Sequence, residues 1–201
     1  MFYVAGKMKQ KSYAIVEPII AVLCIMVLMT IQTVYQTKMH ILQALGVIIV
    51  IMITLYSYYS GKKYQKQRSW SVKLQALILG ACIMVVAIGI NALITGLPIV
   101  NHLYKTLPLN LIIYNCFLAP IAEESIYRQL LYGNWRRMNG RWTGRIITGM
   151  IFVLMHYPQT PSSWLYYILS TIALYVAYEL SGNDIRISIL LHLINNLTVI
   201  I

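Results

Sequence analysis

The chain has 201 residues, of which 59% are hydrophobic and 10% are charged, and its sixteen Lys and Arg against five acids give a formal net charge of +11. Soluble domains are on average about 45–50% apolar and about 25% charged, so an ordinary soluble domain is excluded, because too little polar surface would face water. In a membrane protein an excess of Lys and Arg is typical of cytoplasmic loops, so we expect the lipid bilayer as a partner and no nucleic acid.

Seven apolar runs predict membrane helices. In chain order they cover about residues 14–35, 41–59, 72–94, 107–131, 145–157, 164–180 and 185–201. The first run has no small-residue cleavage site at its end, so we interpret it as an uncleaved membrane helix. The sequence therefore predicts an all-α fold, a polytopic bundle of about seven hydrophobic helices that forms one integral membrane domain over residues 1–201.

Basic residues alternate between the loops that join these runs. The basic segments contain Lys7, Lys9, Lys11, Lys62, Lys63, Lys66, Arg68, Arg136, Arg137 and Arg141. The first and third loops contain only Lys38 and Lys105. Because cytoplasmic loops carry the excess of Lys and Arg, the pattern predicts a multi-pass protein of the cell membrane with its N-terminus in the cytoplasm.

The fifth run is short. Pro158 and Pro161 end it after about 13 residues, which is about 20 Å of helix. A full bilayer span needs about 20 residues, so we expect this run to border a polar cavity inside the bundle.

Polar side chains interrupt the last hydrophobic segments, where an ionisable group costs about 2.5–3.5 kcal/mol on insertion scales. These side chains are Glu123, Glu124, Arg128, His156, His192, Asn195 and Asn196. Residues of this kind usually face the interior of a bundle and have a function. They are therefore the candidate site residues, except Asn195, which points to a different helix face from His192 and Asn196 and is interpreted as structural.

Helical spacing separates the two glutamates. Glu124 and Arg128 are four residues apart, so they share one helix face and form an ion pair that supports the site. Glu123 points about 100° away from Glu124, so the two carboxylates do not share one role. Glu123 is the acid left for chemistry.

Depth in the membrane brings the remaining candidates together. His192 and Asn196 are four residues apart and point in one direction. Counted from the cytoplasmic ends at about 1.5 Å per residue, Glu123, His156, His192 and Asn196 all lie about 10–20 Å deep. An acid, two imidazoles and an amide at one depth indicate a reaction centre.

The sequence has no H-E-x-x-H, no G-x-S-x-G and no P-loop, but a carboxylate beside imidazoles suits the activation of water. Glu123 would act as general base, His156 would orient the water or share its proton, and His192 with Asn196 would donate to the oxyanion. Alternatively, Glu123, His156 and His192 would hold a divalent metal such as zinc, whose bound water attacks.

Three motifs follow one another in the C-terminal half of the chain. Residues 123–128, EESIYR, match E-E-x-x-x-R; residues 152–156, FVLMH, match F-x-x-x-H; and residues 192–196, HLINN, match H-x-x-x-N. In this order the motifs resemble those of the CPBP intramembrane protease family, which includes CAAX prenyl endopeptidases and bacteriocin-immunity relatives. The resemblance covers residues 107–201, the half that carries the catalytic motifs.

The resemblance implies an all-helical membrane bundle that hydrolyses peptide bonds within the membrane. It implies that Glu123 activates water and that His156, His192 and Asn196 complete the site. Where the family often reads F-R-G, this chain has Tyr127, Arg128 and Gln129. That departure adds a hydroxyl near the site and bears on substrate fit.

Two functions fit these features. One is a glutamate-dependent intramembrane endopeptidase, with or without a metal, that acts on a membrane-associated protein or peptide; the small size and bare loops are typical of a bacterial protein. The other is a non-catalytic bacteriocin self-immunity or scaffold protein with the same bundle. A transporter would also place Glu and His in the membrane, but it predicts paired half-repeats with broken helices, which the sequence does not show.

Overall fold

The computed structural model describes residues 40–62, 64–96 and 108–198, together with a few helical positions between residues 20 and 30. Throughout these residues the secondary structure is helical and no strand occurs, which confirms the all-α prediction. Most of the first predicted run, about residues 14–35, lies outside the described residues. The count of seven helices and the cytoplasmic N-terminus therefore stay predictions.

Two long apolar helices form the described N-terminal part, α2 (His40–Lys62) and α3 (Trp70–Thr95). Both are long and apolar enough to cross a membrane, and the rest of the protein buries only 28% and 17% of their spans. The core helix of a soluble protein would be mostly buried, so these outward-facing apolar surfaces support a membrane protein. The helix α3 ends at Gly96, which adopts the left-handed conformation that a glycine tolerates.

The fourth predicted run is a helix with two π-helical stretches. Five segments follow one another without a break: α4 (Leu109–Ile113), η2 (Tyr114–Leu118), α5 (Ala119–Glu124), η3 (Ser125–Tyr132) and α6 (Gly133–Asn139). The predicted end near residue 131 is therefore too early. The stretch α6 is polar, so hydrophobicity stops there while the helical backbone continues.

A proline explains the first π-helical stretch. Pro120 lies at the start of α5, directly after η2. A proline inside a helix has no N–H, and its ring clashes with the carbonyl four residues earlier, here that of Cys116. Widening the helix over η2 relieves the clash, and α5, the segment that carries both glutamates, continues from there.

The last three predicted runs are the helices α7 (Arg141–Met155), α8 (Pro161–Leu180) and α9 (Ile185–Thr198). The helix α7 ends at Met155, before the prolines expected to stop it. Pro161 begins α8, where Thr160 and Ser163 form a capping box. The connection between α7 and α8 is thus short and held at its C-terminal end.

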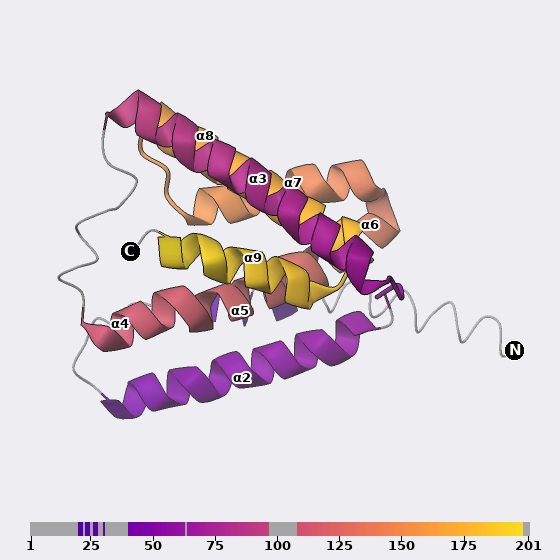
Figure 1. Cartoon of the computed structure of the whole chain (residues 1–201). Coiled ribbons are helices and arrows are strands. Elements are labelled where there is room, and N and C mark those ends of the chain that lie inside the picture. The colour runs from indigo at the N-terminus through magenta and orange to yellow at the C-terminus, as the bar shows by residue number, and fades with distance from the viewer. Residues whose placement is uncertain are drawn as a thin grey trace, which may run out of the picture.

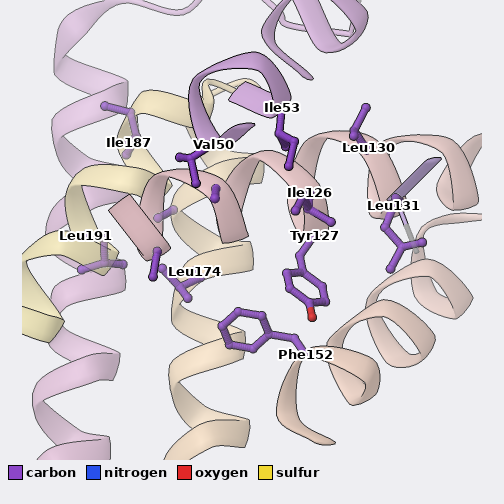
Figure 2. Packing of buried hydrophobic residues seen from close by; sticks show 14 of the residues in the cluster. Val50, Ile53, Ile126, Tyr127, Leu130, Leu131, Phe152, Leu174, Ile187 and Leu191 are labelled. Atoms are coloured by element: carbon purple, nitrogen blue, oxygen red, sulfur yellow. The ribbon is translucent and has the colours of Figure 1, made fainter. Parts of the chain in front are cut away.

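The helices pack around a core to which α2, α3, η2, α5, η3, α7, α8 and α9 contribute. Figure 1 shows α9 between the α4–α5 helix and the neighbouring helices α3 and α8, with α2 along the outer side of α4 and α5. Figure 2 shows side chains of α2, η3, α7, α8 and α9 in one cluster. Among them are Val50, Ile126, Phe152, Leu174 and Leu191. This packing fixes the helices that carry the three motifs.

Polar contacts tie the loops together at the end of the bundle where α3 begins. The N–H of Lys66 donates to the carbonyl oxygen of Gly182 at 2.7 Å, and Lys73 Nζ lies 2.8 Å from Asp184 Oδ2. Arg186 Nη2 lies 2.6 Å from the same carboxylate oxygen. Burial opposes the charge of Asp184, but hydrogen bonds from Arg186 and Lys73 outweigh it and lower the pKa of this carboxyl to about 2.

Candidate active site

The two adjacent glutamates of α5 have different surroundings, as their helical spacing predicts. Glu124 and Arg128 are fully buried, with Arg128 Nη1 3.2 Å from Glu124 Oε1. The guanidinium of Arg128 also lies over the rings of Phe152 and Tyr175, at 4.2 and 5.1 Å from their centroids. Glu123 keeps 23% of its side chain exposed. Glu123 is therefore accessible at the surface of the packed helices, and Glu124 is not.

His192 of α9 bridges both carboxylates. Its Nδ1 lies 3.0 Å from Glu124 Oε1, and its Nε2 lies 3.8 Å from Glu123 Oε2. Helical spacing predicts only the contact between Glu124 and Arg128, because His192 belongs to another helix. The imidazole of His192 thus links the two glutamates, with one ring nitrogen facing Glu124 and the other facing Glu123.

His156 approaches Glu123 from the other side. It directly follows α7, and its Nδ1 lies 2.8 Å from the carbonyl oxygen of Phe152. Its Nε2 lies 3.9 Å from Glu123 Oε2. The rings of Phe152 and Tyr167 also contact the imidazole, with centroids 4.5 and 4.6 Å away. Two imidazoles therefore direct Nε2 toward one carboxylate oxygen.

The hydrogen-bond partners determine which ring nitrogen carries the proton. A carbonyl oxygen and an ionised carboxylate only accept, so we assign the proton of each imidazole to Nδ1. In their neutral forms, His156 and His192 both present an Nε2 lone pair toward Glu123 Oε2, at 3.9 and 3.8 Å. These distances exceed those of direct hydrogen bonds. They suit a bridging water molecule, which donates two protons.

Asn196 has a different neighbour from the other three candidates. Its Nδ2 donates to the carbonyl oxygen of Asn115 in η2 at 2.8 Å. The N–H of Ala119 donates to Tyr114 instead, and residue 120 is a proline without an N–H. The carbonyl of Asn115 therefore lacks both regular helical donors, and Asn196 replaces them. One amide hydrogen of Asn196 remains for another acceptor.

Asn195 takes part in a separate contact, consistent with the different face expected for it. Its side chain and the hydroxyl of Tyr166 in α8 form hydrogen bonds of 3.0 and 3.2 Å. Its Nδ2 also approaches Asn196 Oδ1 at 3.4 Å. Asn195 therefore joins α8 to α9 beside the site.

Glu123, His156 and His192 form the alternative set of metal ligands expected from the sequence. Imidazole and carboxylate are suitable zinc ligands. Across the residues that the structure describes, however, no group of three His, Cys, Asp or Glu side chains has an arrangement that could hold a metal ion. We therefore derive no step through a metal.

The comparison with protein families agrees with the motifs. Residues 105–198, slightly less than half of the chain, match the family model described as type II CAAX prenyl endopeptidase Rce1-like. This match confirms the resemblance to the CPBP proteases. Neither a curated protein nor a solved structure matches the chain.

Proposed function

Because residues 105–198 match the family model described as type II CAAX prenyl endopeptidase Rce1-like, we propose that this protein is an intramembrane endopeptidase. Its substrate would be a membrane-associated protein or peptide, and it would be a multi-pass protein of a bacterial cell membrane. The observation that carries the proposal is the position of Glu123, a partly exposed carboxylate with an imidazole Nε2 3.8 Å and 3.9 Å away on two sides.

Glu123 is the proposed general base. A water molecule between its carboxylate and an imidazole gives one proton to Glu123 while the water oxygen attacks the scissile carbonyl carbon. Glu123 then passes this proton to the leaving nitrogen as the carbon–nitrogen bond breaks. The elements of water are thereby added across the peptide bond, which leaves a new carboxyl group and a new amine.

The two histidines have different proposed roles because their Nδ1 partners differ. His156 donates its Nδ1 proton to a neutral carbonyl, so its Nε2 accepts from the water and orients it. His192 donates from Nδ1 to a buried carboxylate, Glu124, which also stabilises the doubly protonated ring. A protonated His192 also donates from Nε2, which supports its role toward the oxyanion.

Asn196 supplies the proposed second donor to the oxyanion. One of its amide hydrogens is held by the carbonyl of Asn115, which fixes the plane of the amide. The second hydrogen is the one assigned to the oxyanion. In this scheme Glu124 and Arg128 support His192 and do not touch the substrate.

The substitution Glu123→Gln tests the proposal, because it keeps the size of the side chain and removes the base. Purified protein in lipid nanodiscs would be incubated with a prenylated C-terminal peptide, suggested by the name of the family, and with transmembrane peptides. Mass spectrometry would locate the cleaved bond, and cleavage in isotopically labelled water should label the new carboxyl group. A Glu123→Gln protein with normal cleavage would refute the mechanism. A non-catalytic immunity or scaffold role would instead survive the substitution in cells.

A further inference from the structure

Two aromatic rings contact the imidazole of His156, and one of these rings lies outside the three motifs. Phe152 belongs to F-x-x-x-H and lies 4.5 Å away at an interplanar angle of 47°. Tyr167 of α8 lies 4.6 Å away at 38°. Both rings are in contact distance of the imidazole. The ring of Tyr167 therefore adds a second aromatic contact to His156, from a different helix.

His156 needs such support because no regular helix holds it. It directly follows the last residue of α7, with φ −88° and ψ 1°, and Tyr157 after it has a positive φ of 48°. Its side chain is 24% exposed. The hydrogen bond from Nδ1 to Phe152 fixes one edge of the ring, but it leaves the tilt of the ring free. The contact with the ring of Tyr167 restricts that freedom.

Tyr167 is itself held in place. It lies in the second turn of α8, whose start is fixed by Pro161 and the capping box of Thr160. The neighbouring residue Tyr166 packs edge-on against Tyr167 at 5.2 Å and shares its hydroxyl with Asn195 of α9. The start of α8 is thus attached to α9 by Tyr166 and contacts His156 through Tyr167.

We propose that Tyr167 is a positioning residue, whose ring holds Nε2 of His156 toward Glu123. This inference rests on the proposed function, because it assigns Tyr167 to the reaction through His156. Tyr167 contacts His156 through its ring. It follows that Tyr167→Phe keeps the function of the side chain, while Tyr167→Leu retains an apolar group but removes the ring.

The test measures kcat, KM and the state of the His156 ring in the full-length protein in nanodiscs. Tyr167→Leu should lower kcat by about 10- to 100-fold with little change in KM, because small misplacements of a reacting group have effects of this size. Tyr167→Phe should stay within about twofold of the wild type, since the ring face is retained. In NMR spectra of isotope-labelled histidine, assigned with His156→Gln, the wild type should show the Nδ1-protonated ring. Tyr167→Leu should shift that signal toward a mixture of tautomers.

Trp164→Leu is the matched control, because Trp164 is a half-buried aromatic residue near the start of the same helix. It should change neither the His156 signal nor kcat. Equal losses of kcat and Tm in Tyr167→Leu and Trp164→Leu would show a packing role and overturn the proposal. A loss in Tyr167→Phe as large as that in Tyr167→Leu would also overturn it. If the wild type cleaves no peptide, the proposed function fails, while the NMR comparison still decides whether Tyr167 positions His156.

Discussion

Nδ1 of His192 and Oε1 of Glu124 lie 3.0 Å apart, with at most 6% of either side chain exposed. The contact joins the second glutamate of E-E-x-x-x-R to the first histidine of H-x-x-x-N. Because Nε2 of the same ring faces Glu123, both glutamates act on one imidazole from opposite edges. Glu124 is therefore more than the ionic partner of Arg128.

The substitution Glu124→Gln should lower kcat by at least about 10-fold with little effect on KM, because the carboxylate partner of a catalytic histidine fixes its tautomer and stabilises its protonated form. The amide can still accept from Nδ1, but it has no negative charge to stabilise a protonated His192. Steady-state cleavage assays check this. Glu179→Gln is the control, because Glu179 pairs with Arg145 instead. A Glu124→Gln protein with wild-type kcat would contradict the assigned role.

The bond between Asn196 and Asn115 predicts a coupling with Pro120. Asn196→Leu should lower the free energy of unfolding by about 1–3 kcal/mol, since a carbonyl loses its donor. In a Pro120→Ala background residue 120 regains an N–H, so the same substitution should cost less. Thermal and denaturant unfolding in detergent would measure the free energy of unfolding of the wild type, the two single variants and the double variant. Effects that add within about 0.5 kcal/mol would show that proline and asparagine act independently.

Cleavage should survive an excess of chelator, since Glu123 and the two imidazoles account for water activation without a metal. The measurement compares kcat before and after treatment with a strong zinc chelator. Activity that is lost on chelation and restored by zinc would instead assign the ligand set of Glu123, His156 and His192 to a metal.

Asp184 predicts a pH-dependent contribution to stability. Its pKa, lowered to about 2, lies below the ordinary value of about 3.9, so the charged form stabilises the fold fully above about pH 4 and loses this effect as the pH falls toward 2. Asp184→Asn should destabilise the protein by about 1–3 kcal/mol at neutral pH. The difference in Tm from the wild type should shrink below about pH 4. A constant difference across this range would contradict the assignment.

The sequence predicts those features that depend on local spacing. Hydrophobic length locates α2 and α3 to within a few residues. The four-residue spacing predicts the ion pair between Glu124 and Arg128, because helical geometry alone decides it.

Contacts between helices were less predictable. The contact of His192 with Glu124 joins residues far apart in the chain, and no periodicity encodes it. The same holds for the ring of Tyr167 on His156. A signal did exist for η2, because Pro120 within an apolar run predicts a disturbed helix. That the carbonyl of Asn115 loses its helical donors and accepts from Asn196 instead could be seen only in the structure.

The π-helical stretch before Pro120 has a consequence for how related chains should be aligned. A regular α-helix over the same residues would rotate everything after it by about 100° for each residue of register lost. In a chain with the sequence EESIYR but no proline three residues before it, the two glutamates would then face different neighbours. Pro120 should therefore be considered together with the motif E-E-x-x-x-R. A chain that has the motif without this proline need not place its glutamates beside the same residues.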